Sequence, residues 1–324
     1  MRHDITELFC LIDDFCKAYD HAREKYLLQS GCKPRKPTRV PGLTDSEIIT
    51  ILVLFQRDSF RNFKCFYLRL KQDYADEFQK LPTYDRFLVL QQRVLQKLSA
   101  LMHCICSKNA KEAYIDSTAI RVCHNKRIRS HKVFKGLGAI GKSTMGWFYG
   151  FKLHLLIDLK GNIINACITP GNCDDRTLVE KLVQYFQGLI FGDKGYISKS
   201  LFNKLFEKGI KLVTGIKKNM ENNLMILKEK MLLKKRSLIE SVFNLMKRKF
   251  MLEHSRHRSV VNFGTHILST LISYQLSHEK PSISNDYCVL NPWFASVHLS
   301  VFDLLNHEIL CIHQNRMNFC LNFL

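Results

Sequence analysis

The hydrophobic pattern of this chain of 324 residues changes its period near Ala113. Up to about residue 110, apolar residues recur at spacings of three and four, which is the period of amphipathic helices. Beyond that point "AYIDSTAIRVC", "WFYGFKLHLLIDLKG" and "NIINACITPG" predict three strands. "GLIFGDKGY" and "IKLVTGI" predict two more strands, each preceded by a helical segment. This order predicts an α/β domain behind a small helical one.

Basic residues dominate the charge of the chain. There are 49 Lys and Arg against 29 Asp and Glu, a formal net charge of +20. The excess is spread from Arg23 to Arg258 instead of forming a single tail, as expected of a surface that follows a phosphate backbone. We therefore expect a polyanionic partner, with nucleic acid first. The alternative is a generally basic, solvated surface.

The twelve cysteines form no C-x-x-C pair. The closest group, His103-Cys104-Ile105-Cys106, lies in an apolar helical pattern, so we expect no zinc site. The sequence shows neither a signal peptide nor an apolar run long enough to span a membrane. We expect a cytoplasmic protein with reduced thiols and no membrane partner.

The stretch "GLGAIGKS", residues 136–143, matches the phosphate-loop pattern G-x-x-x-x-G-K-[ST]. A working phosphate loop needs a buried strand before it and a helix after it. Here the basic run "RIRSHKVFK" precedes it and a predicted strand follows. We expect a glycine-rich basic loop between the first two strands, with DNA as the partner of its cations Arg127, Arg129, Lys132, Lys135 and Lys142. A P-loop NTPase is the alternative, which Lys142→Ala would test.

Three carboxylates are hard to explain as solvated charges. Asp116 lies in the middle of a predicted strand, where an unpaired carboxylate is costly. Asp193 follows the apolar "LIF" at the end of another strand, and ends of central strands are where α/β folds place active groups. Glu240 lies on a predicted helix with Arg236 and Lys247 on the same face. Asp174 and Asp175, in contrast, open a helix and predict N-capping residues.

Converging carboxylates repel each other unless a cation lies between them. Hard oxygen ligands of this kind select Mg²⁺ or Mn²⁺. Two such ions form a phosphoryl-transfer site, in which one activates the attacking oxygen and the other stabilises the leaving one. In a chain with a net charge of +20, the simplest substrate is a DNA or RNA phosphodiester.

The motifs "YIDST", "FGDKGY" and R-x-x-x-E-x-x-x-x-x-x-K resemble the DDE triad of bacterial insertion-sequence transposases. Over roughly residues 1–282 the chain resembles the insertion-sequence-982 family, which is related to the insertion-sequence-4 group. The stretches that carry this likeness are "GKSTMGWFYGFKLHLLID", "ITPGNCDDR", "LFEKGIKLVTGIKKNM", "EHSRHRS" and "SFRNFKCFYLRL".

This resemblance implies an RNase H-like catalytic domain with a mixed five-stranded sheet and flanking helices. Asp116, Asp193 and Glu240 would be the catalytic metal ligands for one or, as expected, two Mg²⁺ or Mn²⁺ ions. The protein would cut DNA at the ends of the element and join the freed 3′-hydroxyl to target DNA. The resemblance also implies a homo-oligomer assembled on DNA and a location at the bacterial nucleoid.

Several basic residues are expected to hold DNA phosphates. In the related Y-x-x-R-x-x-x-E-x-x-x-x-x-x-K signature, Arg236, Glu240 and Lys247 match, whereas Leu233 replaces the tyrosine. Arg236 and Lys247 are expected near the ends being cut. The other candidates for DNA binding are Lys142, Lys194, His254, Arg256, His257 and Arg258. A solvated basic face is the alternative for the last four.

The sequence predicts three parts: a helical, DNA-binding domain at 1–110, a catalytic domain at 111–282 and an atypical tail at 283–324. The tail loses the basic bias and does not resemble the family. We expect it to be a read-through appendage, with a partner-binding helix as the alternative. For the whole protein, the alternative to an active transposase is an inactive DNA-binding remnant.

Overall fold

The computed structural model describes residues 2–30, 41–58, 60–216, 225–253 and 257–283. The connector at 31–40 and the tail from residue 284 onward lie outside the described residues, so the predictions made for them stay predictions. Among the helices in the described ranges, none combines the length and apolar character needed to cross a membrane.

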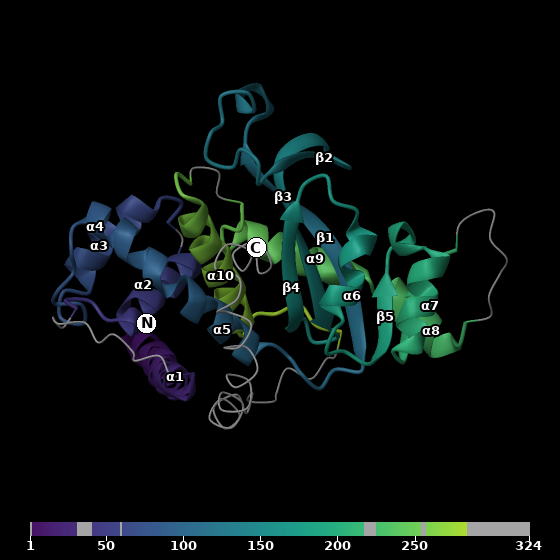
Figure 1. The fold of residues 1–324 in the computed structure, drawn as a ribbon, viewed down its shortest axis with the longest axis horizontal. Helices are drawn as coiled ribbons and strands as arrows, with labels where there is room; N and C mark the ends of the chain where they lie inside the picture. The colour runs from purple at the N-terminus through teal and green to yellow at the C-terminus, as the bar shows by residue number, and fades with distance from the viewer. Residues whose placement is uncertain (1, 31–40, 59, 217–224, 254–256, 284–324) are drawn as a thin grey trace.

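The N-terminal part is helical, as the apolar spacing predicts (Figure 1). It contains α1 (Arg2–Gln29), α2 (Asp45–Arg57), α3 (Phe63–Asp73), α4 (Tyr84–Leu90) and α5 (Leu95–Ile105), with a short 3₁₀ turn between the last two. At the start of α2, the Thr44 side chain accepts the Glu47 N–H while Glu47 accepts the Thr44 N–H. This reciprocal pair is the capping box that "TDSE" predicts.

The sheet has the strand order of an RNase H-like fold. Three strands form an antiparallel meander: β1 (Glu112–Cys123), β3 (Gly146–Asp158) and β4 (Ile163–Pro170). On the other side of β1, β5 (Gly188–Gly192) and β6 (Ile210–Thr214) pair in parallel. The resulting order, β4-β3-β1-β5-β6, confirms the predicted fold class.

A sixth strand, β2 (Ala139–Ser143), was not predicted. It pairs with the first residues of β3 to form a hairpin that rises at the top of Figure 1. Residues 139–143 were expected to belong to a loop, and this expectation is wrong. The error arose because the glycines of "GLGAIGKS" indicate a loop, although Gly141 is buried within the hairpin against Gly171 and Phe148. No phosphate loop exists here, since the motif's Gly141, Lys142 and Ser143 belong to a strand that continues into another strand.

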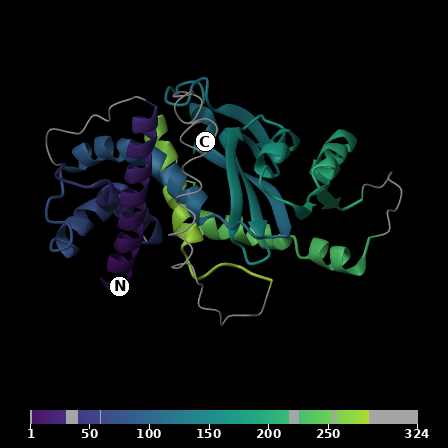
Figure 2. The same cartoon turned by 60° about the horizontal axis from the view of Figure 1, so that its bottom comes forward.

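Helices cover both faces of the sheet (Figure 2). On one face lie α6 (Val179–Leu182) and α7 (Lys199–Glu207), which share a core with Ile115 of β1. On the other lie α8 (Leu227–Lys234) and α9 (Ser237–Arg248), whose core includes Tyr114. Since successive side chains of a strand point to opposite faces, Asp116 shares the face of Tyr114 and points toward α9.

The last described helix, α10 (Val260–Gln275), packs beside the N-terminal helices (Figure 1). Its Gln275 donates to the Ile105 carbonyl of α5 at 3.0 Å, and its Ser273 donates to the Val53 carbonyl of α2 at 3.0 Å. One hydrophobic core joins these helices to the α9 face of the sheet. The division of the chain into three parts stays a prediction. In the structure, α10, from the predicted catalytic part, packs against helices of the predicted N-terminal part.

Candidate active site

Asp116 lies on β1, and Asp193 directly follows β5, the parallel neighbour of β1. Tyr114 of β1 is opposite Phe191 of β5. Asp116 and Asp193 each follow two residues later, so the same parallel alignment brings them next to each other. Adjacent strands are about 4.8 Å apart. Asp193 is exposed where β5 ends, and its carboxylate accepts the Lys194 N–H at 2.7 Å. The parallel pairing therefore places Asp116 and Asp193, two of the three predicted carboxylates, side by side near the end of β5.

Arg236 connects the third carboxylate, that of Glu240, to Asp116. Its Nη1 donates to Asp116 Oδ2 at 3.2 Å, and its Nη2 donates to Glu240 Oε1 at 3.1 Å. Arg236 precedes the first residue of α9 and Glu240 lies one turn later, which is the spacing that the sequence predicts for an ion pair. Glu240 itself is exposed. A single guanidinium thus lies between a carboxylate of the sheet and one of the helix.

The electrostatics of Asp116 show how close the other two acids are. The pKa of Asp116 is raised to about 6, mainly by burial and to a smaller extent by the charges of Asp193 and Glu240. The Ser117 N–H and the charge of Arg236 act in the opposite direction. Asp116 therefore senses two negative charges and one positive charge at close range, as expected where carboxylates gather around a cation.

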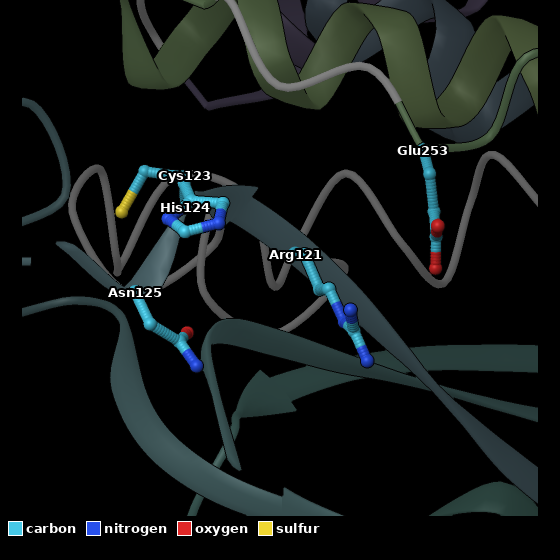
Figure 3. Close-up of a pocket in the computed structure, with 5 residues that line it drawn as sticks. All are labelled: Arg121, Cys123, His124, Asn125 and Glu253. Atoms are coloured by element: carbon cyan, nitrogen blue, oxygen red, sulfur yellow. The ribbon is translucent and has the colours of Figure 1, made fainter. Parts of the chain in front are cut away.

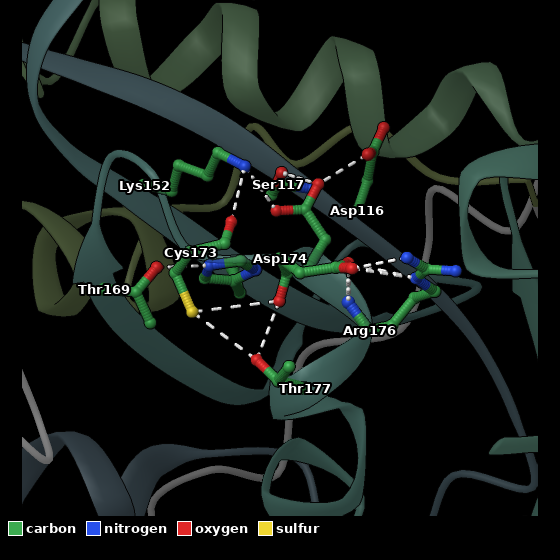
Figure 4. A network of polar contacts seen from close by, with 10 residues as sticks. Asp116, Ser117, Lys152, Thr169, Cys173, Asp174, Arg176 and Thr177 are labelled. Carbon is green, nitrogen blue, oxygen red and sulfur yellow. Dashed lines mark hydrogen bonds and ion pairs between the residues drawn. The ribbon is translucent and has the colours of Figure 1, made fainter. Parts of the chain in front are cut away.

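A second polar network lies beside Asp116 on the opposite face of β1 (Figure 4). Ser117 donates to Asp175 Oδ2 at 3.0 Å, and Lys152 binds Asp175 Oδ1 at 2.8 Å. Lys152 also donates to the Cys173 carbonyl at 2.9 Å. Asp174 caps the following turn, as predicted. Asp175 was predicted to be a capping residue as well, and this prediction is wrong: it lies within the turn, and its carboxylate instead binds Ser117 of β1 and Lys152 of β3.

Tyr196 contributes a buried hydroxyl to the same region. Only 3% of the residue is exposed, and its hydroxyl finds no hydrogen-bond partner among the described residues. Burial raises its pKa well above the ordinary value, and the charges of Asp116, Asp175 and Asp193 raise it further. Tyr196, Lys152 and the contacts of Asp175 were not predicted from the sequence. A lysine between apolar residues of a strand, as in "FKLHLL", was the one available signal, because a buried lysine requires a buried partner.

The predicted DNA-binding residues do not form one surface of free cations. Lys142, Lys194 and Arg258 are exposed. Lys247 instead binds Glu253 at 2.7 Å and the Ala119 carbonyl at 3.3 Å. The His257 ring packs against Phe263 and His266, with centroids 5.5 and 4.9 Å away. His254 and Arg256 lie outside the described residues.

A pocket of about 340 Å³ lies further along β1 (Figure 3). It is lined by Arg121, Cys123, His124, Asn125 and Glu253. Glu253 also pairs with Lys247 of α9. The lining of the pocket has both charge signs and only one sulfur ligand, which does not suit a tight metal site.

The donor set fits a hard divalent cation by its chemistry, since Asp116, Asp193 and Glu240 offer only carboxylate oxygens. In the described part of the chain, no three His, Cys, Asp or Glu side chains already converge closely enough to hold a metal ion. Arg236 instead provides the positive charge between Asp116 and Glu240. The three residues therefore have the ligand chemistry that such an ion requires, and Arg236 lies between Asp116 and Glu240.

A family model matches the part of the chain that contains this site. Residues 106–260, which contain all three carboxylates, match the model of a family described as a transposase DDE domain. This match supports a DDE transposase. No curated protein matches the chain.

Two solved structures are similar to the chain at low identity. The piggyBac transposase synaptic complex with hairpin DNA has a TM-score of 0.42 and 11% identity, covering 94% of this chain and 81% of that one. The Mos1 transposase paired-end complex with the left transposon end has a TM-score of 0.21 and 13% identity, covering 78% and 86%.

Proposed function

We propose that this protein is a transposase that cleaves DNA at the ends of an insertion sequence and joins them to target DNA. The main support is that Arg236 joins Asp116 to Glu240 and that Asp116 senses the charge of Asp193, inside the region that matches the transposase DDE domain. The net charge of +20 supports a nucleic-acid substrate. We also propose membership of the insertion-sequence-982 family, assembly as a homo-oligomer on DNA and action at the bacterial nucleoid.

In this proposal Asp116, Asp193 and Glu240 hold Mg²⁺ or Mn²⁺. When bound, these ions activate the attacking oxygen and stabilise the leaving one. Asp116 is fixed by the Ser117 N–H and by its place within β1. Arg236 donates to both Asp116 and Glu240, and in the metal-bound protein its guanidinium would hold phosphate oxygens. Lys194, next to Asp193, and Arg258 would bind the DNA backbone.

The test uses a plasmid that carries the reading frame with its flanking DNA on both sides. Purified protein with Mg²⁺ or Mn²⁺ is expected to nick the plasmid at the boundaries of the element. Asp116→Asn, Asp193→Asn and Glu240→Gln should each abolish the nicks, whereas Glu180→Gln should not. Glu180 is a matched control because its partners among the described residues are two surface lysines, Lys204 of α7 and Lys208 just after it.

Two results would contradict this proposal. If all three triad variants nick the plasmid as the unmodified protein does, the triad is assigned wrongly. If the unmodified protein binds the plasmid but never cuts it, the inactive remnant is the better interpretation. Inverted repeats just outside the reading frame, bounded by a duplicated target, would establish the mobile origin independently of activity.

A further inference from the structure

The hairpin of β2 and β3 carries apolar side chains on its outer face. Lys142 is the cross-strand partner of Trp147, and its Nζ lies 5.7 Å from the centre of the indole ring. Trp147 is 60% exposed, Met145 at the turn is 83% exposed and Ile140 is 48% exposed. An exposed tryptophan beside a lysine is an unusual surface feature, because large aromatic side chains normally bury most of their area.

The hairpin is a rigid platform for this ring. Its inner face is buried, with Phe148 fully covered and Gly141 against the backbone of Gly171. Asn125 donates to the Trp147 carbonyl at 2.9 Å, which ties the strand to the preceding loop. Trp147 is therefore held in the open by a well-packed strand, and its exposure does not come from poor packing beneath it.

The segment that carries the ring has charges of one sign. Residues 117–157 contain eight Lys or Arg and no Asp or Glu. Seven of these cations are exposed: Arg121, Lys126, Arg127, Arg129, Lys132, Lys135 and Lys142. A protein partner would need a strongly acidic surface with an apolar centre. A nucleic-acid strand needs nothing special, since every nucleotide offers a phosphate and a flat base.

We propose that this hairpin is a binding site for single-stranded DNA, in which an unpaired base stacks on Trp147 and Lys142 with the neighbouring cations holds the phosphates. An unpaired base is required, because the faces of bases inside a duplex are already stacked. Combinations of aromatic rings with basic side chains are the usual means of binding single strands. This proposal rests on the proposed binding of nucleic acid by the chain. It does not depend on DNA cleavage at the carboxylates.

The site is distinct from the carboxylates. Leu155 of β3 is the cross-strand partner of Asp116, and Trp147 precedes Leu155 by eight residues of the same strand. At about 3.3 Å per residue, this separates Trp147 from Asp116 by roughly 26 Å along the sheet. A strand that reaches both sites must therefore span several nucleotides between them.

Tryptophan fluorescence provides a direct test. The chain contains only Trp147 and Trp293, so full-length protein with Trp293→Phe reports on Trp147 alone. The probes are an oligothymidylate longer than about 16 nucleotides, which exceeds the usual site size, and an abasic oligomer of the same length and charge. We expect the oligothymidylate to quench the fluorescence and the abasic oligomer to bind without quenching.

Variants separate the roles of the ring and the cation. Trp147→Leu should weaken oligothymidylate binding about tenfold and leave abasic binding unchanged. Lys142→Gln should weaken both and lower the slope of log affinity against log salt by about one. Phe206→Leu is the matched control, because Phe206 is another exposed aromatic residue, on α7, and is 67% exposed.

Two outcomes overturn the proposal. Equal quenching by both oligomers, or no quenching by either while both bind, means that no base stacks on the ring. Alternatively, if Trp147→Leu leaves DNA binding intact but converts an oligomer to monomers in sedimentation, the face is an interface between copies of the chain. The quenching measurement uses the intact ring and therefore stands even if Trp147→Leu fails to fold. Loss of nicking by the triad variants has no bearing on either outcome.

Discussion

The guanidinium of Arg236 donates to Asp116 at 3.2 Å although the two residues are 120 positions apart in sequence. Asp116 also senses the negative charges of Asp193 and Glu240. Arg236 therefore holds together a group of carboxylates that would otherwise repel one another, which gives it a structural role in addition to its proposed contact with DNA.

Removal of Arg236 should therefore lower stability in the absence of divalent metal. Arg236→Met leaves the largely buried Asp116 beside two acids without a cation, and we expect a loss of about 1–3 kcal/mol in the free energy of unfolding. Urea unfolding at pH 7.5 measures it. The double variant Arg236→Met, Asp116→Asn should recover most of the loss. A single variant as stable as the unmodified protein would show that the ion pair contributes nothing.

Loss of the hydroxyl group should have opposite effects on stability at Tyr196 and Tyr114. Tyr196→Phe removes a buried hydroxyl that has no partner among the described residues, so it should leave stability unchanged or raise it by about 1 kcal/mol. Tyr114→Phe removes a donor to the Leu232 carbonyl at 2.8 Å and should lower stability by about 1–3 kcal/mol. Thermal unfolding of both variants gives the comparison. A destabilised Tyr196→Phe would mean that its hydroxyl has a partner after all.

His154 should make the protein sensitive to mild acid. The residue is fully buried in β3, and burial lowers its pKa from 6.5 to about 4. Between these pH values His154 is protonated in the unfolded chain but neutral in the folded chain. The free energy of unfolding therefore falls as pH drops from 6.5 toward 4. The expected loss is up to about 3 kcal/mol.

The measurement is urea unfolding at several pH values for the unmodified protein and His154→Gln. The stability difference between the two should narrow or change sign as pH falls through this window, because glutamine does not titrate. His278→Gln, at an exposed position, should follow the unmodified protein. A difference between His154→Gln and the unmodified protein that stays constant with pH would contradict the prediction.

Gly141 should tolerate no side chain. A Cβ atom there would overlap the Gly171 carbonyl and approach Phe148. Gly141→Ala is expected to cost about 1–3 kcal/mol and to loosen the hairpin. Gly42→Ala is the control, because a Cβ there meets nothing within 4 Å. Thermal unfolding tests both variants, and equal stabilities would show that the hairpin can shift to make room.

Local patterns predicted most of the catalytic fold. The apolar run at 210–216 predicted the last strand, observed at Ile210–Thr214, and the Arg236–Glu240 pair follows directly from helical spacing. Register could not be predicted in this way. That Asp193 lies next to Asp116 depends on the parallel pairing of β1 with β5, which the single sequence suggests only through resemblance to a family.

The residues that the sequence argument missed depend on contacts between distant segments. Asp175 looked like a helix cap because it follows Asp174 at the start of a turn, yet its partners are Ser117 and Lys152 on two strands. β2 was missed because glycines usually mark loops, whereas Gly141 is required by a close approach to Gly171. Neither contact leaves a periodic signal in the sequence.

The packing of α10 against the first helices has a consequence for protein synthesis. Gln275 closes a contact with Ile105 that spans 170 residues. At ~5–20 residues per second, the ribosome needs roughly 10–30 s to make that span. During this interval the faces of α2 and α5 that α10 will cover have no partner. The emerging N-terminal part therefore offers chaperones an apolar surface until α10 has been made.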